Sequence, residues 1–236
     1  MNAPTSPLSP MYDFWTVRCL RFVALFFIFA VMLAIVFYPG GNIHNPAQRG
    51  YSITHNFLSD LGGYHSHSGD TNLLSALFFN LSMVMFLGVG ISFLFVPRLF
   101  KEDALNFAIA IIGSIFFLFG TMFFAGVGLT PYDLYLQMHN FFAVNAFRLL
   151  IPGALAYLIV LLRSPVKNRY ALVTMFYLVS TAAYVIYQLL SGSPMDNPAE
   201  MVRQATIQKL IVLVSVATIF SLSFAFSSQL RHLRLD

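Results

Sequence analysis

The chain has 236 residues, of which 58% are hydrophobic and only 9% are charged, and it contains 26 phenylalanines. Soluble globular domains carry about 25% charged residues, so this composition excludes a protein that hides its apolar surface in one water-soluble core. The net charge is +4, but no basic cluster interleaved with aromatic residues occurs in a polar segment, so nucleic-acid binding is not expected. Cys19 is the only cysteine, which excludes an intrachain disulfide and a thiolate metal site.

The first segment, residues 1–15, is predicted to be a disordered tail because Pro4, Pro7 and Pro10 stand among serine and threonine. The hydrophobic run that follows is too long for a secretory signal. It is also not followed by a clean small-residue cleavage site, since Phe37 to Gly40 reads FYPG. The first helix is therefore expected to remain in the protein.

The chain contains six apolar runs long enough to cross a membrane. A helix rises about 1.5 Å per residue and needs roughly 20 apolar residues to span the hydrocarbon core. The sequence therefore predicts an all-α protein with a six-transmembrane-helix domain over residues 16–228 and a cytoplasmic tail over 229–236. The predicted spans are about 16–38, 73–96, 104–127, 138–162, 170–190 and 205–227.

The basic residues predict the orientation of the bundle. Nine of the 13 lysines and arginines fall on the side of the two termini, while the opposite loops carry only Arg49 and Arg203. Cytoplasmic loops are enriched in basic residues, so a multi-pass cell-membrane protein with both termini in the cytoplasm is predicted. The nine are Arg18, Arg21, Arg98, Lys101, Arg163, Lys167, Arg169, Arg231 and Arg234.

The first outer loop, about residues 39–72, is long and is expected to be structured. Its stretch YSITHNFLSDLGG (51–63) mixes apolar residues with Asn56, Ser59 and Asp60. Such a segment is expected to pack on the bundle or to enter the interface, with these polar groups as ligand-binding candidates. A purely local role is the alternative, in which Ser59 and Asp60 cap the backbone and Gly62-Gly63 makes a turn.

Two basic residues, Arg148 and Lys209, lie inside predicted spans. Arg148 is about 15 residues, or roughly 22 Å, from the inner edge of its span, which places it in the outer third of the membrane. Intramembrane charges generally face the bundle interior and have a partner, for which Asp60 and Asp133 are available. Snorkelling and a structural ion pair are the alternatives. On a helical wheel, His139 points about 180° away from Arg148, so both cannot line one narrow pocket unless the helix breaks.

Two motifs carry a resemblance to a known family. They are LSDLGG (58–63), which follows the first helix, and LTPYDLYLQMH (129–139), with Asn80 between them. Over roughly residues 17–228 the chain resembles the six-helix prokaryotic membrane family catalogued as domain of unknown function 998. The resemblance implies six spans and an outer polar cluster of Asp60, Asp133 and His139, and it brings no activity.

The first functional hypothesis is that the outer cluster binds or transports an anionic lipid or small molecule. Arg148 could hold a phosphate or carboxylate by a bidentate fork and Lys209 as a point charge. The other ligand-binding candidates are Asn56, Ser59, Asp60 and Asp133. The bilayer is the expected partner, with an anionic lipid as the candidate ligand.

A second hypothesis is a zinc-dependent membrane lipid hydrolase that resembles the alkaline ceramidase and adiponectin-receptor superfamily. Zinc, the only cofactor that the sequence suggests, would lower the pKa of a bound water for attack on an acyl carbon. The superfamily places a histidine pair in its last helix, and this chain has none there. A third hypothesis is a non-catalytic assembly subunit with the outer loop as a docking surface. The candidate zinc ligands are His55, His65, His67 and His139.

Overall fold

The computed structural model describes residues 10–235, so residues 1–9 of the predicted tail lie outside the described part. Within that part, six helices are long and apolar enough to cross a membrane. The predicted all-α, multi-pass architecture is confirmed at this level.

The elements are α1 (Pro10–Asp13), a π-helical turn η1 (Phe14–Arg18), α2 (Cys19–Phe37), β1 (Gly40–Asn42), β2 (Asn45–Arg49), the 3-10 helix η2 (Leu58–Gly62), α3 (Leu73–Phe95), the 3-10 helix η3 (Val96–Phe100), α4 (Ala104–Leu129), α5 (Tyr132–Leu162), α6 (Asn168–Leu190) and α7 (Pro198–Leu235).

The first helix starts earlier than the sequence predicted. Residues 10–15, expected to be disordered, are helical because two aromatic side chains anchor them to the second span, α3. The Tyr12 hydroxyl donates to the Phe95 carbonyl at 2.8 Å, and Trp15 stacks on Phe95 with ring centroids 5.8 Å apart. Aromatic contacts of this kind add to the apolar burial that fixes a helix end.

Three further helix ends differ from the prediction. α5 begins at Tyr132 rather than near 138, and α7 begins at Pro198 rather than near 205. α7 also continues through the predicted tail to Leu235. Gln229, 2% exposed, donates from Nε2 to the Leu99 carbonyl at 3.0 Å. The lengths of the apolar runs therefore predicted where the spans lie, but the helices extend beyond these runs, and in α7 the extension includes the polar contact of Gln229.

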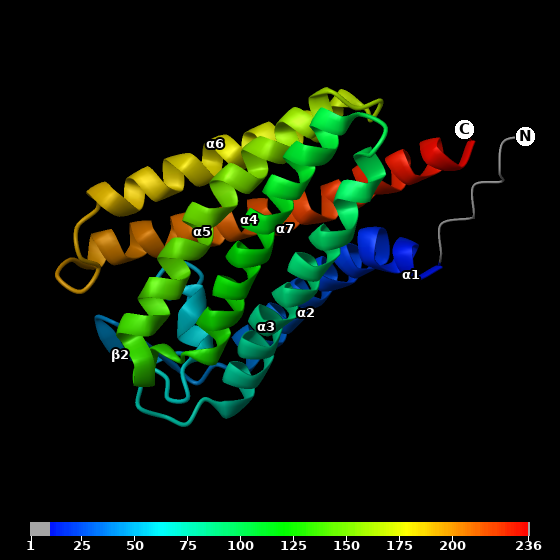
Figure 1. The fold of residues 1–236 in the computed structure, drawn as a ribbon. Coiled ribbons are helices and arrows are strands. Elements are labelled where there is room, and N and C mark those ends of the chain that lie inside the picture. The colour runs from blue at the N-terminus through cyan, green and yellow to red at the C-terminus, as the bar shows by residue number, and fades with distance from the viewer. Residues whose placement is uncertain (1–9, 236) are drawn as a thin grey trace, which may run out of the picture.

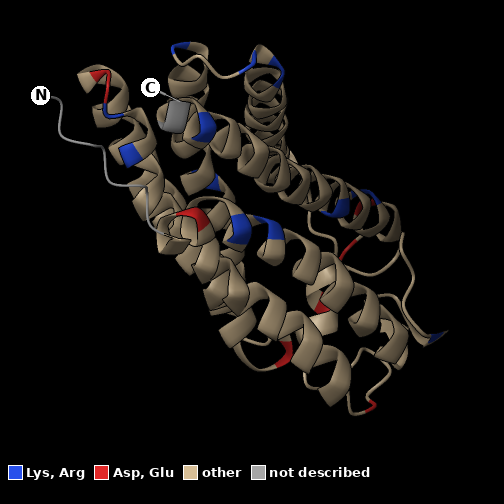
Figure 2. Ribbon diagram, turned by 90° about the vertical axis from the view of Figure 1, so that its right-hand side faces the viewer, with Lys and Arg blue, Asp and Glu red and all other residues tan. Residues whose placement is uncertain are grey.

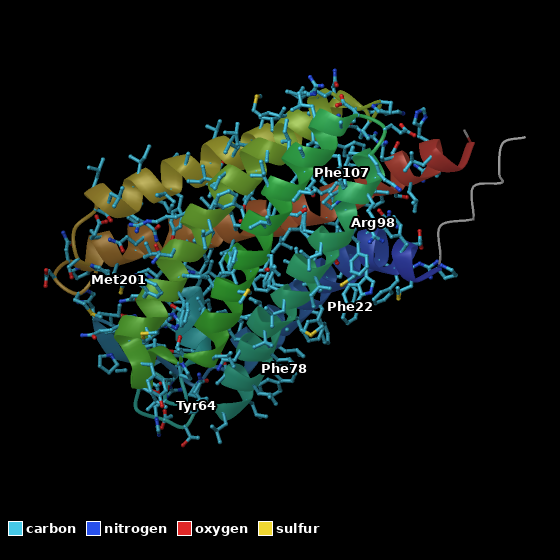
Figure 3. The ribbon with its side chains drawn as sticks, in the orientation of Figure 1. Phe22, Tyr64, Phe78, Arg98, Phe107 and Met201 are labelled. Atoms are coloured by element: carbon cyan, nitrogen blue, oxygen red, sulfur yellow. The ribbon has the colours of Figure 1, made fainter. Side chains whose placement is uncertain are left out.

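The six long helices form a closed ring. Each packs on the next in chain order, and α7 packs on both α6 and α2 (Figure 1). α1 and the C-terminal end of α7 lie at one end of the bundle, here called the termini end, where Lys and Arg gather (Figure 1 and Figure 2). The opposite end, here called the cap end, carries Tyr64 and Met201, while Arg98 and Phe107 lie toward the termini end (Figure 3).

An aromatic cluster fills the ring toward the termini end. Phe93 stacks on Phe117 with centroids 4.2 Å apart, and Tyr157 meets Phe93 at 4.9 Å and Phe226 at 5.9 Å. Tyr157 is 0% exposed, and its hydroxyl forms a 2.7 Å hydrogen bond with the Ser114 hydroxyl. Four helices thus meet at this aromatic plug, which closes one half of the bundle.

The connection between α2 and α3 closes the cap end. It contains the antiparallel pair β1 and β2 and the 3-10 helix η2. Within η2, Leu58 is 8% exposed and Leu61 is 0% exposed, so this short helix packs onto the bundle through its apolar side chains. Residues 38–72 are here called the cap.

The close approach of α4 to α3 gives a first prediction. A Cβ atom added at Gly128 would lie 2.7 Å from the Asn80 carbonyl oxygen and 2.8 Å from the Met83 Cβ. Gly128→Ala should lower the melting temperature in detergent, because overpacking that displaces backbone costs about 1–3 kcal/mol. Gly192→Ala is the control, since no atom lies within 4 Å of its added Cβ. Equal melting temperatures for the two variants would contradict the packing.

Candidate functional site

A cavity of about 580 Å³ lies within the ring. Its deep wall is apolar and includes Phe117 of the plug, whereas its polar wall is built from the cap and the start of α5. Ligand pockets of about 300–1,000 Å³ with mostly apolar walls and a few polar groups are typical binding sites. The apolar wall includes Phe86, Phe117, Phe124, Leu150 and Leu222, and the polar wall includes Ser59, Asp60, His67, Tyr132 and His139.

Asp60 lies at the centre of the polar wall. Asp60 is 4% exposed. Its Oδ2 accepts hydrogen bonds from Asn56 Nδ2 and from the Phe57 backbone N–H, both at 2.9 Å. Its Oδ1 lies 3.3 Å from His67 Nε2. That contact lacks hydrogen-bond geometry, since His67 Nε2 is buried without a hydrogen-bond partner. One carboxylate oxygen is therefore held by the cap, and the other receives no hydrogen bond from the described residues.

Asn56 positions Asp60 from behind the cavity wall. Asn56 is 0% exposed, and its Nδ2 also donates to the Gly41 carbonyl at 2.8 Å. Its Oδ1 accepts from Gln48 Nε2 at 2.7 Å and from the Ser52 N–H at 2.9 Å. The amide thus has all its hydrogen bonds satisfied, as a buried amide requires. Asn56 serves the fold of the cap, and it does not line the cavity.

α7 fixes the cap from the other side. Gln208 Oε1 accepts from the Leu58 N–H at 2.8 Å, at the first residue of η2. The Lys209 ammonium donates to the Asn56 carbonyl and to the Ala205 carbonyl of its own helix. Two neighbouring side chains of α7 therefore bond to backbone groups of the cap: Gln208 pairs the Leu58 N–H, and Lys209 shares the Asn56 carbonyl with the Tyr51 hydroxyl.

Two cap tyrosines stay neutral beside Asp60. Burial raises the pKa of Tyr38, and the nearby Asp60 carboxylate raises it further. The pKa of Tyr51 is raised by the same two causes in the same order. Both phenols therefore remain protonated at physiological pH. The Tyr38 hydroxyl donates to the Gly41 carbonyl at 3.3 Å, and the Tyr51 hydroxyl donates to the Asn56 carbonyl at 3.3 Å.

His139 presents an acceptor to the cavity. Its Nδ1 lies 2.7 Å from the Thr130 carbonyl oxygen, and the residue is 4% exposed. A carbonyl oxygen can only accept, so Nδ1 carries the hydrogen. The neutral ring then has its lone pair on Nε2.

The two sequence motifs meet at the cap end. The Asp133 carboxylate accepts from the Tyr64 N–H at 3.1 Å and from the His65 N–H at 3.0 Å. A Cβ atom on Gly63 would lie 2.4 Å from Cε1 of Tyr132, so this close approach requires glycine. Asp133 therefore joins the start of α5 to the cap. It does not line the cavity.

The predicted anion site of Arg148 and Lys209 is not formed. The Arg148 side chain is exposed on the outside of α5 and donates to Asn145 Oδ1 at 3.3 Å. Its separation from His139 on the helical wheel explains this, because His139 faces the cavity. The Lys209 ammonium is bound by backbone carbonyls. Of the six predicted ligand-binding residues, only Ser59 and Asp60 line the cavity.

The four predicted zinc ligands do not form a metal site. His67 and His139 line the cavity, whereas the exposed His55 contacts the hydroxyls of Ser52 and Thr54. The His65 side chain is 61% exposed. Among residues 10–235, no three or more His, Cys, Asp or Glu side chains are grouped so that they could hold a metal ion. His55, His65 and His67 are near each other in sequence, but in the folded cap only His67 reaches the cavity.

Several polar residues of the cavity were missed from the sequence. Gln188 of α6 lines the wall, and its Oε1 is buried without a partner in the described structure, while its Nε2 donates to the Tyr184 hydroxyl at 3.1 Å. Amides inside apolar runs were the available signal, because such groups are costly in hydrocarbon. The missed wall residues include Tyr132, Tyr187, Gln188, Gln204 and Gln208.

The cavity opens on the side of the ring between α5 and the connection of α6 to α7. Its most exposed wall residues are Leu136 and Asn140 of α5 and Gly192, Ser193 and Met195 of that connection. α5 and α6 separate from each other toward the cap end (Figure 1). The opening therefore faces sideways between helices, at the level where the polar wall begins.

No protein-family model, curated protein or solved structure matches this chain. Its function is therefore argued from the geometry of the cavity and the cap.

The cap network gives a second prediction. Asn56→Ala should destabilise the cap, because each buried hydrogen-bonding group left without a partner costs about 1–3 kcal/mol. Thermal melting should move down, and proteolysis within residues 38–72 should become faster. His55→Ala is the matched control one position away, since His55 is exposed and contacts only two hydroxyls. Unchanged proteolysis in Asn56→Ala would show that the network does not hold the cap.

Proposed function

We propose that this chain is a membrane protein that binds an amphipathic, lipid-like molecule in the cavity between the aromatic plug and the cap. The cavity itself carries the proposal, because it combines an apolar depth with one polar wall and a sideways opening. An alkyl chain fits the apolar wall, and a head group fits near Asp60, His67 and His139. A six-helix bundle places such an opening against lipid, from which the ligand would enter.

We further propose that the cap end faces the outside and that both termini are cytoplasmic. The support is the positive-inside rule together with the concentration of Lys and Arg at the termini end (Figure 2). In this orientation the cap is the structured outer loop, and the ligand comes from the outer leaflet.

The geometry favours binding over the other two roles considered. A zinc-dependent hydrolase would draw on the outer histidines, of which only His67 and His139 reach the cavity. An assembly subunit would use the cap as a docking surface. The central residues of the cap instead face inward, as the burial of Leu58, Asp60 and Leu61 shows.

We also propose that the chain is related to the family catalogued as domain of unknown function 998. The support is the joint position of the two motifs, since Asp133 of the second accepts hydrogen bonds from the two residues that follow the first. The close contact of Gly63 with Tyr132 adds a reason for both motifs to occur together.

The orientation is tested by a third prediction. In a Cys19→Ala background, single cysteines are placed at Tyr64 in the cap and at Lys101 between η3 and α4, both exposed positions. A membrane-impermeant maleimide added to intact cells should label Tyr64→Cys and leave Lys101→Cys unlabelled until the cells are opened. The reverse pattern would invert the proposed topology.

Ligand binding is tested by a fourth prediction. The probe is a long-chain alcohol with a photoactivatable diazirine near the end of its chain, added to protein in lipid nanodiscs. Its crosslinks should map to apolar wall residues such as Phe86 and Leu150. Ala143→Phe adds a ring to the cavity wall and should reduce these crosslinks at least tenfold.

The control for this experiment is Leu155→Phe. Leu155 is on the same helix, is 48% exposed and is not part of the cavity wall, so its crosslinks should match those of the unmodified chain. Labelling confined to exposed residues, or equal labelling of Ala143→Phe, would contradict the proposal.

A further inference from the structure

We infer that the cavity selects an amphiphile whose head group donates hydrogen bonds and is neutral or positively charged, such as a long-chain alcohol or primary amine. This inference rests on the proposed function, because it assumes that the cavity binds a lipid-like molecule. It differs from the prediction made from the sequence, in which Arg148 and Lys209 would bind an anionic ligand.

The charge of the wall is the first observation. Asp60 is the only Asp, Glu, Lys or Arg among the described wall residues. Lys209 lies behind the wall, where two backbone carbonyls bind its ammonium. In a low-dielectric interior, the attraction between opposite charges and the repulsion between like charges are strong over a few ångströms. A phosphate or carboxylate head group would therefore meet the Asp60 carboxylate in a wall that contains no Lys or Arg, while Lys209 attracts Asp60 from behind the wall and His67 lies 3.3 Å from it.

The unpaired atoms beside Asp60 are the second observation. Asp60 Oδ1 and His67 Nε2 lie 3.3 Å apart, within ion-pair distance, but they form no hydrogen bond with each other, and His67 Nε2 is buried without a hydrogen-bond partner among the described residues. Leaving such buried groups unpaired is costly, and a ligand that pairs them recovers the cost. A ligand hydroxyl can donate to Asp60 Oδ1 and accept from His67 Nε2–H. A primary ammonium can donate to both atoms when Nε2 carries the lone pair.

Two further polar groups of the wall, on His139 and Gln188, are the third observation. His139 offers the Nε2 lone pair, because its Nδ1 hydrogen is used by the Thr130 carbonyl. Gln188 Oε1 is buried without a partner, while the amide nitrogen of the same side chain is already bonded. Both atoms, His139 Nε2 and Gln188 Oε1, are hydrogen-bond acceptors. Together with Asp60 Oδ1, these acceptor atoms can pair with hydrogen-bond donors on the head group of a ligand.

The experiment uses four photoactivatable probes with the same long chain and a diazirine near its end, differing only in the head group. The heads are a hydroxyl, a primary ammonium, a trimethylammonium and a phosphate. Each is added at equal concentration to the full chain in nanodiscs of neutral lipid. The measurement is the crosslink yield at wall residues divided by the yield at lipid-facing residues, which corrects for partitioning into the bilayer.

The hydroxyl and primary ammonium probes should label the wall at least tenfold more than the phosphate probe. The trimethylammonium probe, which is cationic but has no N–H donor, should label it less than the primary ammonium. Asp60→Asn removes the charge and should bring the ammonium and phosphate yields closer together. Asp70→Asn is the control, since this cap carboxylate is exposed, lies outside the cavity wall and accepts a side-chain hydrogen bond from Ser68 that an amide oxygen can also accept.

Different outcomes separate the two proposals. If no probe labels the wall, the proposed binding function fails. If the phosphate probe labels the wall as well as the hydroxyl probe, binding stands and the head-group inference is overturned. Equal labelling by trimethylammonium and primary ammonium would overturn the hydrogen-bond part. Gln188→Glu gives a second test if Asp60→Asn does not fold, because an added carboxylate should raise the ratio of ammonium to hydroxyl labelling.

Discussion

Polar groups inside a membrane-spanning bundle must find their partners within the protein, because the hydrocarbon around the bundle offers none. The cap meets this constraint around one carboxylate. Asp60 accepts two hydrogen bonds from its own segment, and Asn56 ties that segment to the hairpin of β1 and β2. α7 supplies the remaining partners through Gln208 and Lys209. The network that folds the cap therefore also aims the free oxygen of Asp60 into the cavity.

The bundle is asymmetric for a simple packing reason. Toward the termini end, large aromatic side chains from four helices meet at Tyr157 and fill the ring. Toward the cap end, α5 and α6 separate (Figure 1), and the aromatic side chains there, such as Phe147 and Tyr184 at 5.0 Å, line the cavity and leave it open. Close packing in one half allows the other half to remain hollow, because the ring is held together at the plug and at the cap. A cavity that is closed below and capped above can open only at its side.

The sequence predicted the spans well and the site only in part. Apolar runs of about 20 residues located all six helices, since length and hydropathy are local properties of the chain. The early start at Pro10 depended on Phe95, more than 80 residues away, and could not be read locally. Asp60 was found because a charged residue in an apolar motif is unusual. The same reasoning selected Arg148, whose side chain is exposed on the outside of α5. The sequence does not say whether a polar residue faces the cavity or the outside.

The cap and the side opening are mechanically linked through the connection of α6 to α7. His44, in the hairpin of the cap, donates from Nε2 to the Pro194 carbonyl at 2.8 Å. Pro194 lines the cavity next to the exposed residues of the opening, and α7 continues from this connection to Gln208, which binds the first residue of η2. The connection is therefore tied to the cap at two points, through its own Pro194 carbonyl and through Gln208 of the helix that follows it. These contacts join the residues of the opening to the segment that holds Asp60.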